Sequence, residues 1–350
     1  MRLLICTQAV DSQDPILGFF HRWLLEFAKQ CESIEVICLR EGKHNLPAHV
    51  HVHSLGKERG TTRMTRLIRF YYFALRYLFR YDAVFIHMNP EYAILGWPLW
   101  KLSGKRRVLW YTHKSASMMV RIGSRLVDTI CTASYESFRL KRSNVHVTGH
   151  GIDTAVFASE RPGAPDFLRL VVLGRISPAK GIMSIFEALP GLSQSGVSYK
   201  LMVVGGPVTN ADILYETELR GFVETYHLSD NVVLAGSKPA SEIPKLLGEC
   251  DIMLHASTTG SLDKVALEAM AAQCLVISSN DAVKPILAKV QQDLVVAEPK
   301  PELFLKALMH VHHLGESERE ALGIASRAIV EREHALPNLI ERLICTLKNK

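Results

Sequence analysis

Residues 171–189, VVLGRISPAKGIMSIFEAL, combine a β-branched run, a glycine-containing turn and a helical pattern in one short stretch. The run ends at Gly174, and Gly181 opens a segment whose apolar residues recur at helical spacing. A strand that passes through a turn into a helix is the unit from which parallel sheets with crossover helices are built. This stretch therefore predicts an α/β fold.

The same alternation extends outward from residues 171–189 over almost the whole chain. Short strand-like runs are separated by helical segments in both halves of the sequence. The runs cover residues 2–7, 34–40, 49–55, 82–89, 106–113, 128–134 and 144–151, and then 168–174, 200–206, 231–236, 251–257, 275–280 and 293–298. We predict two Rossmann-like, doubly wound units that face each other across a cleft.

The polar, proline-containing residues 157–167 are typical of a linker between two such units. The chain is predicted to be helical after Pro301, with Pro337 as one interior break, and its last helix is expected to pack back onto the first domain. The expected domains are residues 1–158, joined by residues 335–350, and residues 166–334.

The chain has 350 residues, of which 48% are hydrophobic and 22% charged. This composition supplies two apolar cores and excludes the disordered, collagen-like, coiled-coil and disulfide-scaffold classes. The net charge of +6 is uneven, because residues 1–160 hold 22 Lys and Arg against 13 Asp and Glu, or +9, and residues 161–350 carry −3. We expect the basic half to face an anionic partner.

The seven cysteines form no C-x-x-C pair and most lie in apolar runs, which favours buried free thiols in a reducing compartment. The apolar stretches at residues 70–86 and 92–100 are interrupted before they reach the length of a bilayer, and the N-terminal apolar run is short for a secretory signal. We expect a cytoplasmic protein, peripheral on the inner face of the membrane.

Arg175 and Lys180 directly follow the strand at residues 168–174 and stand before a helix. Two cations beside a helix N-terminus suit a diphosphate, because the dipole and the free amides add to the side-chain charges. The alternative is a solvated basic loop. Either way, the position at a strand end is where parallel sheets gather binding residues.

A second stretch, DIMLHASTTGSLDKVALEAMA at residues 251–271, places a small polar turn between a strand and a helix. Backbone amides in such a turn can cradle phosphate, and a carboxylate such as Glu268, in the second turn of the helix, can accept two ribose hydroxyls. The alternative is that Asp263 caps the helix and that Glu268 lies on its surface.

In this order the two stretches resemble the GT-B glycosyltransferases of family four, the retaining nucleotide-sugar enzymes. The resemblance runs from about residue 130 to 280 and includes GHGIDTAVF (149–157), VVGG (203–206), NVVLAG (231–236) and LEAMAAQCLVISS (267–279). It implies a hexosyltransferase-type enzyme that moves a sugar, with retention, from a nucleotide diphosphate sugar to a glycan or lipid-linked acceptor in cell-surface polysaccharide or glycoconjugate synthesis. A UDP sugar is favoured over a GDP sugar as the donor.

The resemblance also implies roles for individual residues. Arg175 and Lys180 would hold the diphosphate and stabilise its departure, and Glu268 would take the ribose hydroxyls. Because no D-x-D, H-E-x-x-H or Cys/His cluster is present in the sequence, neither a metal ion nor another cofactor is expected. Further donor contacts are implied for Gly18, Gly205, Lys238, Pro239, Ser261 and Leu262, and contact with the transferred sugar for His113. Two more histidines, His87 and His150, stand at predicted strand ends and are candidates for binding.

The sequence departs from the family's E-x7-E pair, because Gly260 replaces the first glutamate. Asp263, three residues later, is a candidate substitute. Two alternatives to an active transferase stay open. One is a catalytically degenerate, nucleotide-binding partner subunit, and the other is a nucleotide-sugar epimerase on the same fold.

Residues 57–80 carry much of the N-terminal charge. At helical spacing the six arginines from Arg59 to Arg80 share one side with interleaved aromatic residues, and Met64, Ile68 and Leu75 lie opposite. We predict that the arginine and aromatic side is exposed and suits an anionic membrane surface or a lipid-diphosphate acceptor. The alternative is a solvated basic face, and no nucleic-acid partner is expected because no nucleic-acid module accompanies the charge.

Overall fold

A computed structural model describes residues 1–14, 17–114, 116–158, 163 and 166–348. The chain divides into two compact units. The first comprises Met1–Gly151 together with Leu336–Lys350, and the second comprises Ile152–Ala335.

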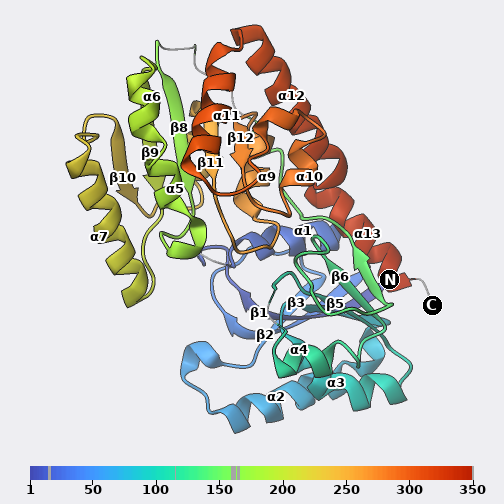
Figure 1. Cartoon of the computed structure of the whole chain (residues 1–350). Coiled ribbons are helices and arrows are strands. Elements are labelled where there is room, and N and C mark those ends of the chain that lie inside the picture. The colour runs from blue at the N-terminus through green and yellow to red at the C-terminus, as the bar shows by residue number, and fades with distance from the viewer. Residues whose placement is uncertain (15–16, 115, 159–162, 164–165, 349–350) are drawn as a thin grey trace. The chain divides into compact units, whose positions relative to one another are not determined.

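The first unit is built on a seven-stranded sheet in which every pairing is parallel (Figure 1). The strand order is β3-β2-β1-β4-β5-β6-β7. The strands are β1 (Arg2–Val10), β2 (Ser33–Glu41), β3 (Val50–Ser54), β4 (Ala83–His87), β5 (Arg106–Trp110), β6 (Thr129–Thr132) and β7 (Val145–Val147).

Helices cover both faces of this sheet. On one face, α1 (Phe19–Gln30) packs against the C-terminal helix α13 (Leu336–Lys348), which also contacts β4 and β5. On the other face, Phe70, Tyr92, Trp100 and Val120 join one core with strand residues. The helices that supply these four side chains are α2 (Arg63–Arg76), α3 (Pro90–Leu102) and α4 (Met118–Gly123), with the short turns η1 (Lys57–Arg59) and η2 (Leu78–Arg80) beside α2.

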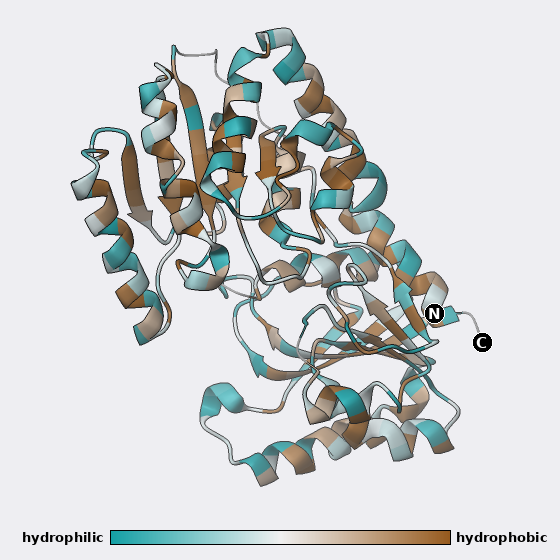
Figure 2. Cartoon of the chain, viewed as in Figure 1, coloured by the Kyte–Doolittle hydropathy of each residue, from teal (hydrophilic) through white to brown (hydrophobic). Residues whose placement is uncertain are grey.

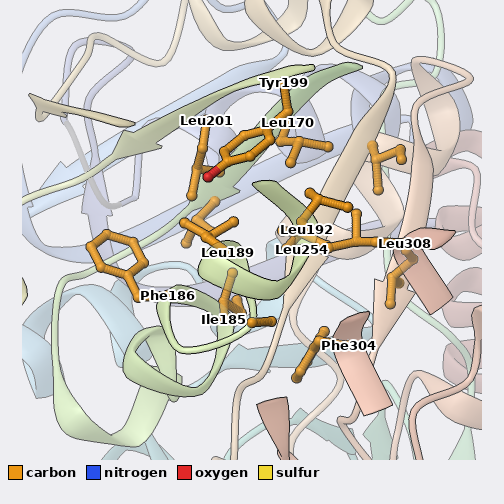
Figure 3. Packing of buried hydrophobic residues seen from close by; sticks show 14 of the residues in the cluster. Leu170, Ile185, Phe186, Leu189, Leu192, Tyr199, Leu201, Leu254, Phe304 and Leu308 are labelled. Atoms are coloured by element: carbon orange, nitrogen blue, oxygen red, sulfur yellow. The ribbon is translucent and has the colours of Figure 1, made fainter. Parts of the chain in front are cut away.

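The second unit has a five-stranded parallel sheet in the order β10-β9-β8-β11-β12. Leu170, Leu201 and Leu254 from its strands pack against Ile185, Leu189 and Phe304 from its helices (Figure 3). The strands are β8 (Leu168–Leu173), β9 (Tyr199–Val204), β10 (Val232–Gly236), β11 (Ile252–His255) and β12 (Leu275–Ser278). The helical segments are η3 (Pro178–Lys180), α5 (Ile182–Phe186), α6 (Leu189–Gln194), α7 (Asn210–Thr225), α8 (Ile243–Glu249), α9 (Lys264–Ala271), α10 (Lys284–Leu287), η4 (Gln292–Leu294), α11 (Pro301–His313) and α12 (Glu316–Glu333).

Both sheets reverse their strand order once, between β1 and β4 in the first unit and between β8 and β11 in the second. Such a switch point leaves a crevice at the carboxyl ends of the strands, where ligands bind in open α/β sheets. The predicted α/β class with two Rossmann-like units is confirmed. Among the described residues, no helix has both the length and the apolar character needed to cross a bilayer.

Two boundaries differ from the predictions, and part of a third predicted segment is not described. Residues 152–158, expected in the first domain, belong to the second unit, because Arg327 donates to the carbonyls of Thr154 and Phe157 and Ile152 pairs with Ala335. The run at 293–298 forms only a single bridge at Val295 rather than a strand. Much of the predicted linker at 157–167, namely residues 159–162 and 164–165, lies outside the described residues.

The C-terminal helical region breaks at different points from the one predicted. Helix α11 ends at His313 and α12 ends at Glu333, whereas Pro337 lies in the first turn of α13. Proline is tolerated in the first turn because the amide it lacks has no partner inside the helix.

Helix α2 exposes Arg63 and Arg76, as predicted, but its aromatic and apolar residues differ from the prediction. Phe70 and Ala74 face the core, whereas Met64, Ile68 and Leu75 are exposed. The reason is tertiary packing, because the aromatic residues between the arginines fill the space under the helix. Tyr71 fixes this orientation by donating a hydrogen bond to the carbonyl of Leu95 in α3.

Candidate functional site

The loops at the carboxyl ends of β8, β9 and β10 are packed against each other in the second unit. The amide of Gly174 donates to the carbonyl of Val204 at 2.9 Å, and the amide of Gly205 donates to the carbonyl of Gly236 at 2.9 Å. A Cβ atom at Gly205 would lie 1.8 Å from the carbonyl oxygen of Gly174, so no side chain fits there. The loops after these three strands are therefore held together by main-chain hydrogen bonds.

Lys180 ends η3, in the loop that follows β8. The next residue, Gly181, has a φ of 61° and leaves no space for a Cβ atom, which would meet the carbonyl oxygen of Ala256 at 2.5 Å. The amide of Thr258 donates to the carbonyl of Ala179 at 2.9 Å. These contacts fix the loop that carries Lys180 against the loop that follows β11.

Lys180 forms an ion pair with Asp263, with 2.7 Å between Nζ and Oδ2. The same carboxylate oxygen lies 2.9 Å from Nε2 of His255. Asp263 stands at the N-cap position of α9 but makes no side-chain capping hydrogen bond. The alternative that Asp263 caps the helix is therefore excluded, because its carboxylate faces Lys180 and His255 instead.

His255 is the last residue of β11 and is buried. Its Nδ1 lies 2.9 Å from the hydroxyl of Ser278, and the amide of Asn280 donates to that hydroxyl at 3.1 Å. The side-chain amide of Asn280 donates to the carbonyl of Ser257. A chain of polar contacts thus runs from β12 through His255 to Asp263. The one sequence signal for it is the position of His255 at the end of a strand, directly before the polar turn.

Asp263 is held as an anion. Burial alone would raise the pKa of its carboxyl, but the hydrogen bond from His255 and the charge of Lys180 outweigh burial and hold that pKa well below its usual range. The site consequently carries a stable negative charge beside the cation expected to bind phosphate.

Arg175 follows β8 and is half exposed. Its Nε lies 3.8 Å from a carboxylate oxygen of Asp212, which is engaged in the capping box of α7 with Thr209. Burial would raise the pKa of Asp212, but hydrogen bonds from Thr209 and Val208 outweigh this effect and lower it. The carboxylate of Asp212 therefore orients the guanidinium of Arg175, much of whose surface faces solvent.

Glu268 lies in the second turn of α9, as predicted, with Oε1 3.4 Å from Nζ of Lys264. Ser261 and Leu262 precede this helix, and Leu262 is buried.

Helix α5, which follows Lys180, has only five residues, so its dipole is weaker than expected from the sequence. The anion-binding potential of the site depends mainly on side chains and loop amides.

Lys238 and Pro239 follow β10 at the same edge of the sheet. Nζ of Lys238 lies 3.7 Å from a carboxylate oxygen of Glu242. In the second unit the structure thus gathers Arg175, Lys180, Gly205, Lys238 and the loop before α9 at the carboxyl ends of neighbouring strands.

Gly18 and His113 belong to the first unit. Gly18 stands at the N-cap of α1, where a Cβ atom would lie 2.6 Å from the carbonyl oxygen of Asp14. His113 is exposed after β5, and its ring meets Tyr111 edge-on at 6.5 Å. His113 follows the carboxyl end of β5, and Gly18 lies between β1 and α1, where the sequence places both.

His87 is a core residue rather than a binding residue. It is buried, its Nδ1 lies 3.2 Å from the hydroxyl of Thr7, and its ring stacks on Phe20 at 4.0 Å. Burial lowers the pKa of His87 to about 3. His150 is also buried, with its ring near that of Trp110. Both side chains are closed off from solvent, which disfavours a role for either in binding.

No group of three or more metal-ligating side chains is found within the part of the chain that the structure describes. The charged groups that the site offers to a ligand include the guanidinium of Arg175, the ammonium groups of Lys180 and Lys238, and the carboxylates of Asp263 and Glu268. This set, with the surrounding amides, can bind a phosphate-bearing molecule and stabilise a leaving phosphate.

Comparison with known proteins finds a family match for most of the second unit. Residues 158–328 match the family model of the glycosyl transferases group 1. The chain is 28% identical over 159 residues to the putative colanic acid biosynthesis glycosyltransferase WcaL of Escherichia coli K12, covering 43% of this chain and 37% of that protein. It is 29% identical over 213 residues to the amylovoran biosynthesis glycosyltransferase AmsK of Erwinia amylovora, covering 57% of this chain and 51% of that protein. The chain thus spans about two fifths to half of the length of these relatives.

The fold is also that of a solved structure. The crystal structure of Anabaena HepE in complex with UDP matches 99% of this chain and 99% of that chain, with a TM-score of 0.77 and 15% sequence identity. At this identity the likeness shows a shared fold alone.

Proposed function

Residues 158–328 belong to the glycosyl transferases of group 1, and from this premise we propose that the chain is a glycosyltransferase of the GT-B fold that uses a nucleotide diphosphate sugar. The observation that carries the proposal is the position of Lys180 and Arg175 after β8, the strand at which the second sheet reverses its order. A diphosphate bound there would meet two cations and the amides of several strand-end loops.

The donor is proposed to be a UDP sugar, which is supported by HepE, whose crystal structure contains UDP. Glu268 would accept the ribose hydroxyls, Lys238 and Pro239 would border the base, and Ser261 and Leu262 would offer amides to the phosphates. Gly18 and Gly205 would let main chain approach the donor closely, and His113 would contact the transferred sugar.

The chemistry proposed for these residues is electrostatic. As the bond between the sugar and the diphosphate breaks, negative charge grows on the leaving phosphate, where Lys180 and Arg175 stabilise it. The acceptor hydroxyl then attacks the anomeric carbon from the face that the diphosphate leaves and gives its proton to the departing phosphate oxygen, so the configuration is retained. Because two side-chain cations would face the phosphates, we propose that transfer needs no metal ion.

The acceptor is proposed to be a glycan or a lipid-linked sugar in cell-surface polysaccharide synthesis. This is supported by the relatives named for colanic acid and amylovoran biosynthesis. A cytoplasmic location is proposed as well, because six of the seven cysteines are buried, as expected of thiols in a protein from a reducing compartment.

Calorimetric titration of the chain with UDP and with GDP tests the donor site. We expect UDP to bind and Lys180→Gln to weaken the binding by about 10- to 100-fold, since a charged hydrogen bond contributes about 1.5–3 kcal/mol. The matched control is Lys245→Gln, which removes an exposed lysine from α8 of the same unit. A chain that binds neither nucleotide contradicts the proposal.

A second candidate function is a nucleotide-binding partner subunit without transferase activity. Gly260 favours it, because it stands where the family has a glutamate and adopts a φ of 69°. Two measurements on the same protein separate the two functions: binding of a UDP sugar, and release of UDP from that sugar when cell extracts that contain acceptors are added. Binding without any release of UDP favours the partner subunit.

A further inference from the structure

The outer side of α2 is an apolar stripe. Met64, Ile68, Tyr72 and Leu75 recur at intervals of four, four and three residues, which places them on one face of a helix. All four are more than half exposed, and Ile68 at the centre of the helix is 63% exposed. Phe79 in η2 extends the stripe and is 84% exposed. We call these five residues the α2 stripe.

The two helices beside α2 add further exposed apolar side chains. Helices α2, α3 and α4 lie together on one face of the first sheet (Figure 1), and α3 contacts both of the others. Hydrophobic positions alternate with hydrophilic ones along α2 and α3 (Figure 2). Leu102, at the end of α3, is 89% exposed, and Met118, at the start of α4, is 71% exposed. The other exposed apolar residues of α3 and α4 are Trp97, Met119 and Ile122.

Positive charge borders the α2 stripe. The segment from Arg59 to Tyr81 contains six arginines and no acidic residue. Arg63, Arg76 and Arg80 are exposed, and the guanidinium of Arg76 lies over the ring of Tyr72 at 6.0 Å. Within the described residues, no ion pair to a carboxylate engages any arginine of α2 or η2.

Large exposed apolar surfaces mark interaction sites, because water contact with them costs free energy. The side chains of the α2 stripe are long or aromatic, and uncompensated arginines accompany them. This combination is typical of helices that lie in the interface of an anionic bilayer, where the apolar face enters the acyl boundary and the cations meet lipid phosphates.

We infer that the α2 stripe, with its flanking arginines, docks the chain onto an anionic lipid bilayer. The sequence predicted that this helix meets such a surface through its arginines and the aromatic residues between them. The structure adds an apolar element that enters the bilayer. The inference deepens the proposed function. Membrane docking itself stands on the surface of α2, and only the link from docking to a lipid-linked acceptor rests on the proposed function.

Vesicle flotation of the full chain tests this inference. The probes are vesicles of phosphatidylcholine alone and of phosphatidylcholine mixed with an equal amount of phosphatidylglycerol. We expect the chain to float with the anionic vesicles only. Replacing Met64, Ile68 and Leu75 by serine should weaken binding at least tenfold. Replacing Arg63, Arg76 and Arg80 by glutamine should weaken it about 100-fold, since each surface arginine contributes about 1 kcal/mol, or roughly fivefold.

The matched control replaces Val208, Ile213 and Leu214 by serine, because these apolar residues of the second unit are similarly exposed. The control should float like the parent, and both stripe variants should keep the parent's melting temperature. Parental flotation of the serine variant, or no flotation of the parent, overturns the inference. If the parent instead forms a dimer in light scattering that the serine variant loses, the stripe binds a second copy and not a membrane.

UDP binding is measured on the same samples. A chain that floats but binds no nucleotide contradicts the proposed function and leaves membrane docking supported. A chain that binds UDP but does not float contradicts membrane docking alone.

Discussion

The ammonium of Lys180 lies 2.7 Å from the carboxylate of Asp263, and this pair joins the loop after β8 to the start of α9. Asp263 is also held by His255, so the position of Lys180 is set by a buried network that extends to Ser278 in β12. The cation proposed to bind the diphosphate is thus positioned by residues from two other strands.

Breaking this pair should destabilise the second unit. Asp263→Asn keeps the size of the side chain but leaves a largely buried lysine without its anion, which we expect to lower the free energy of unfolding by about 1–3 kcal/mol. The matched control is Asp281→Asn, whose carboxylate is exposed beside Lys284 and whose loss should change stability by less than about 0.5 kcal/mol. Urea unfolding measures both, and equal stability of the two variants would contradict the structural role of Asp263.

The same carboxylate should make stability depend on pH at the acid end. Because the pKa of Asp263 is lowered in the folded state, its contribution is present above the unfolded pKa, near 4, and is lost as the pH falls towards the folded pKa. Between pH 5 and pH 3, the parent should therefore lose more stability than Asp263→Asn. Unfolding curves at these two pH values give the difference, and parallel losses would show that Asp263 is not held as an anion.

His87 predicts a second pH effect, at milder acidity. Its folded pKa of about 3 lies below the unfolded value, so folding is favoured at neutral pH and weakened as the pH falls below about 6.5. From pH 7 to pH 5 this single group should cost about 2 kcal/mol. His87→Gln, which can still bond Thr7, should show a flatter profile over that range, as measured by thermal unfolding. An unchanged slope would mean that other groups cause the loss.

Glycine substitutions test the close packing of the strand-end loops. Gly205→Ala places a Cβ atom 1.8 Å from the carbonyl of Gly174 at a φ of 144°, so we expect a loss of about 3 kcal/mol or more. Gly221→Ala is the control, because its Cβ atom has open space inside α7 and alanine favours the helix by about 1 kcal/mol. Opposite shifts in melting temperature are expected, and a tolerated Gly205→Ala would show that the loops can separate.

Local patterns predicted most of the fold. The βα stretch at residues 171–189 and the alternation around it were enough for two parallel sheets, because buried parallel strands have a distinctive β-branched composition. The exposed side of α2 was predicted only in part, because Arg63 and Arg76 are exposed but Phe70 is buried and Ile68 is exposed. Helical periodicity divides residues into faces, but which face meets the core depends on neighbours such as Tyr71 and Leu95, which are distant in sequence.

The sequence analysis named the cations of the site but did not identify the residues that hold them in position. Arg175, Lys180 and Glu268 could be placed from their positions after strands and in a helix. The role of His255 required knowing that β11 and β12 are neighbours, which brings Ser278 and Asp263 to its two ring nitrogens. The alternative in which Asp263 caps α9 does not hold, because its carboxylate contacts Lys180 and His255 instead of the helix amides.

Calorimetric titration of UDP into the parent chain, Lys180→Gln and Lys245→Gln tests the proposed diphosphate site most directly. We expect the parent and Lys245→Gln to bind UDP with equal affinity and Lys180→Gln to bind it about 10- to 100-fold more weakly. Equal UDP affinity in all three proteins, or no binding by the parent, would contradict the assignment of a diphosphate site at Lys180.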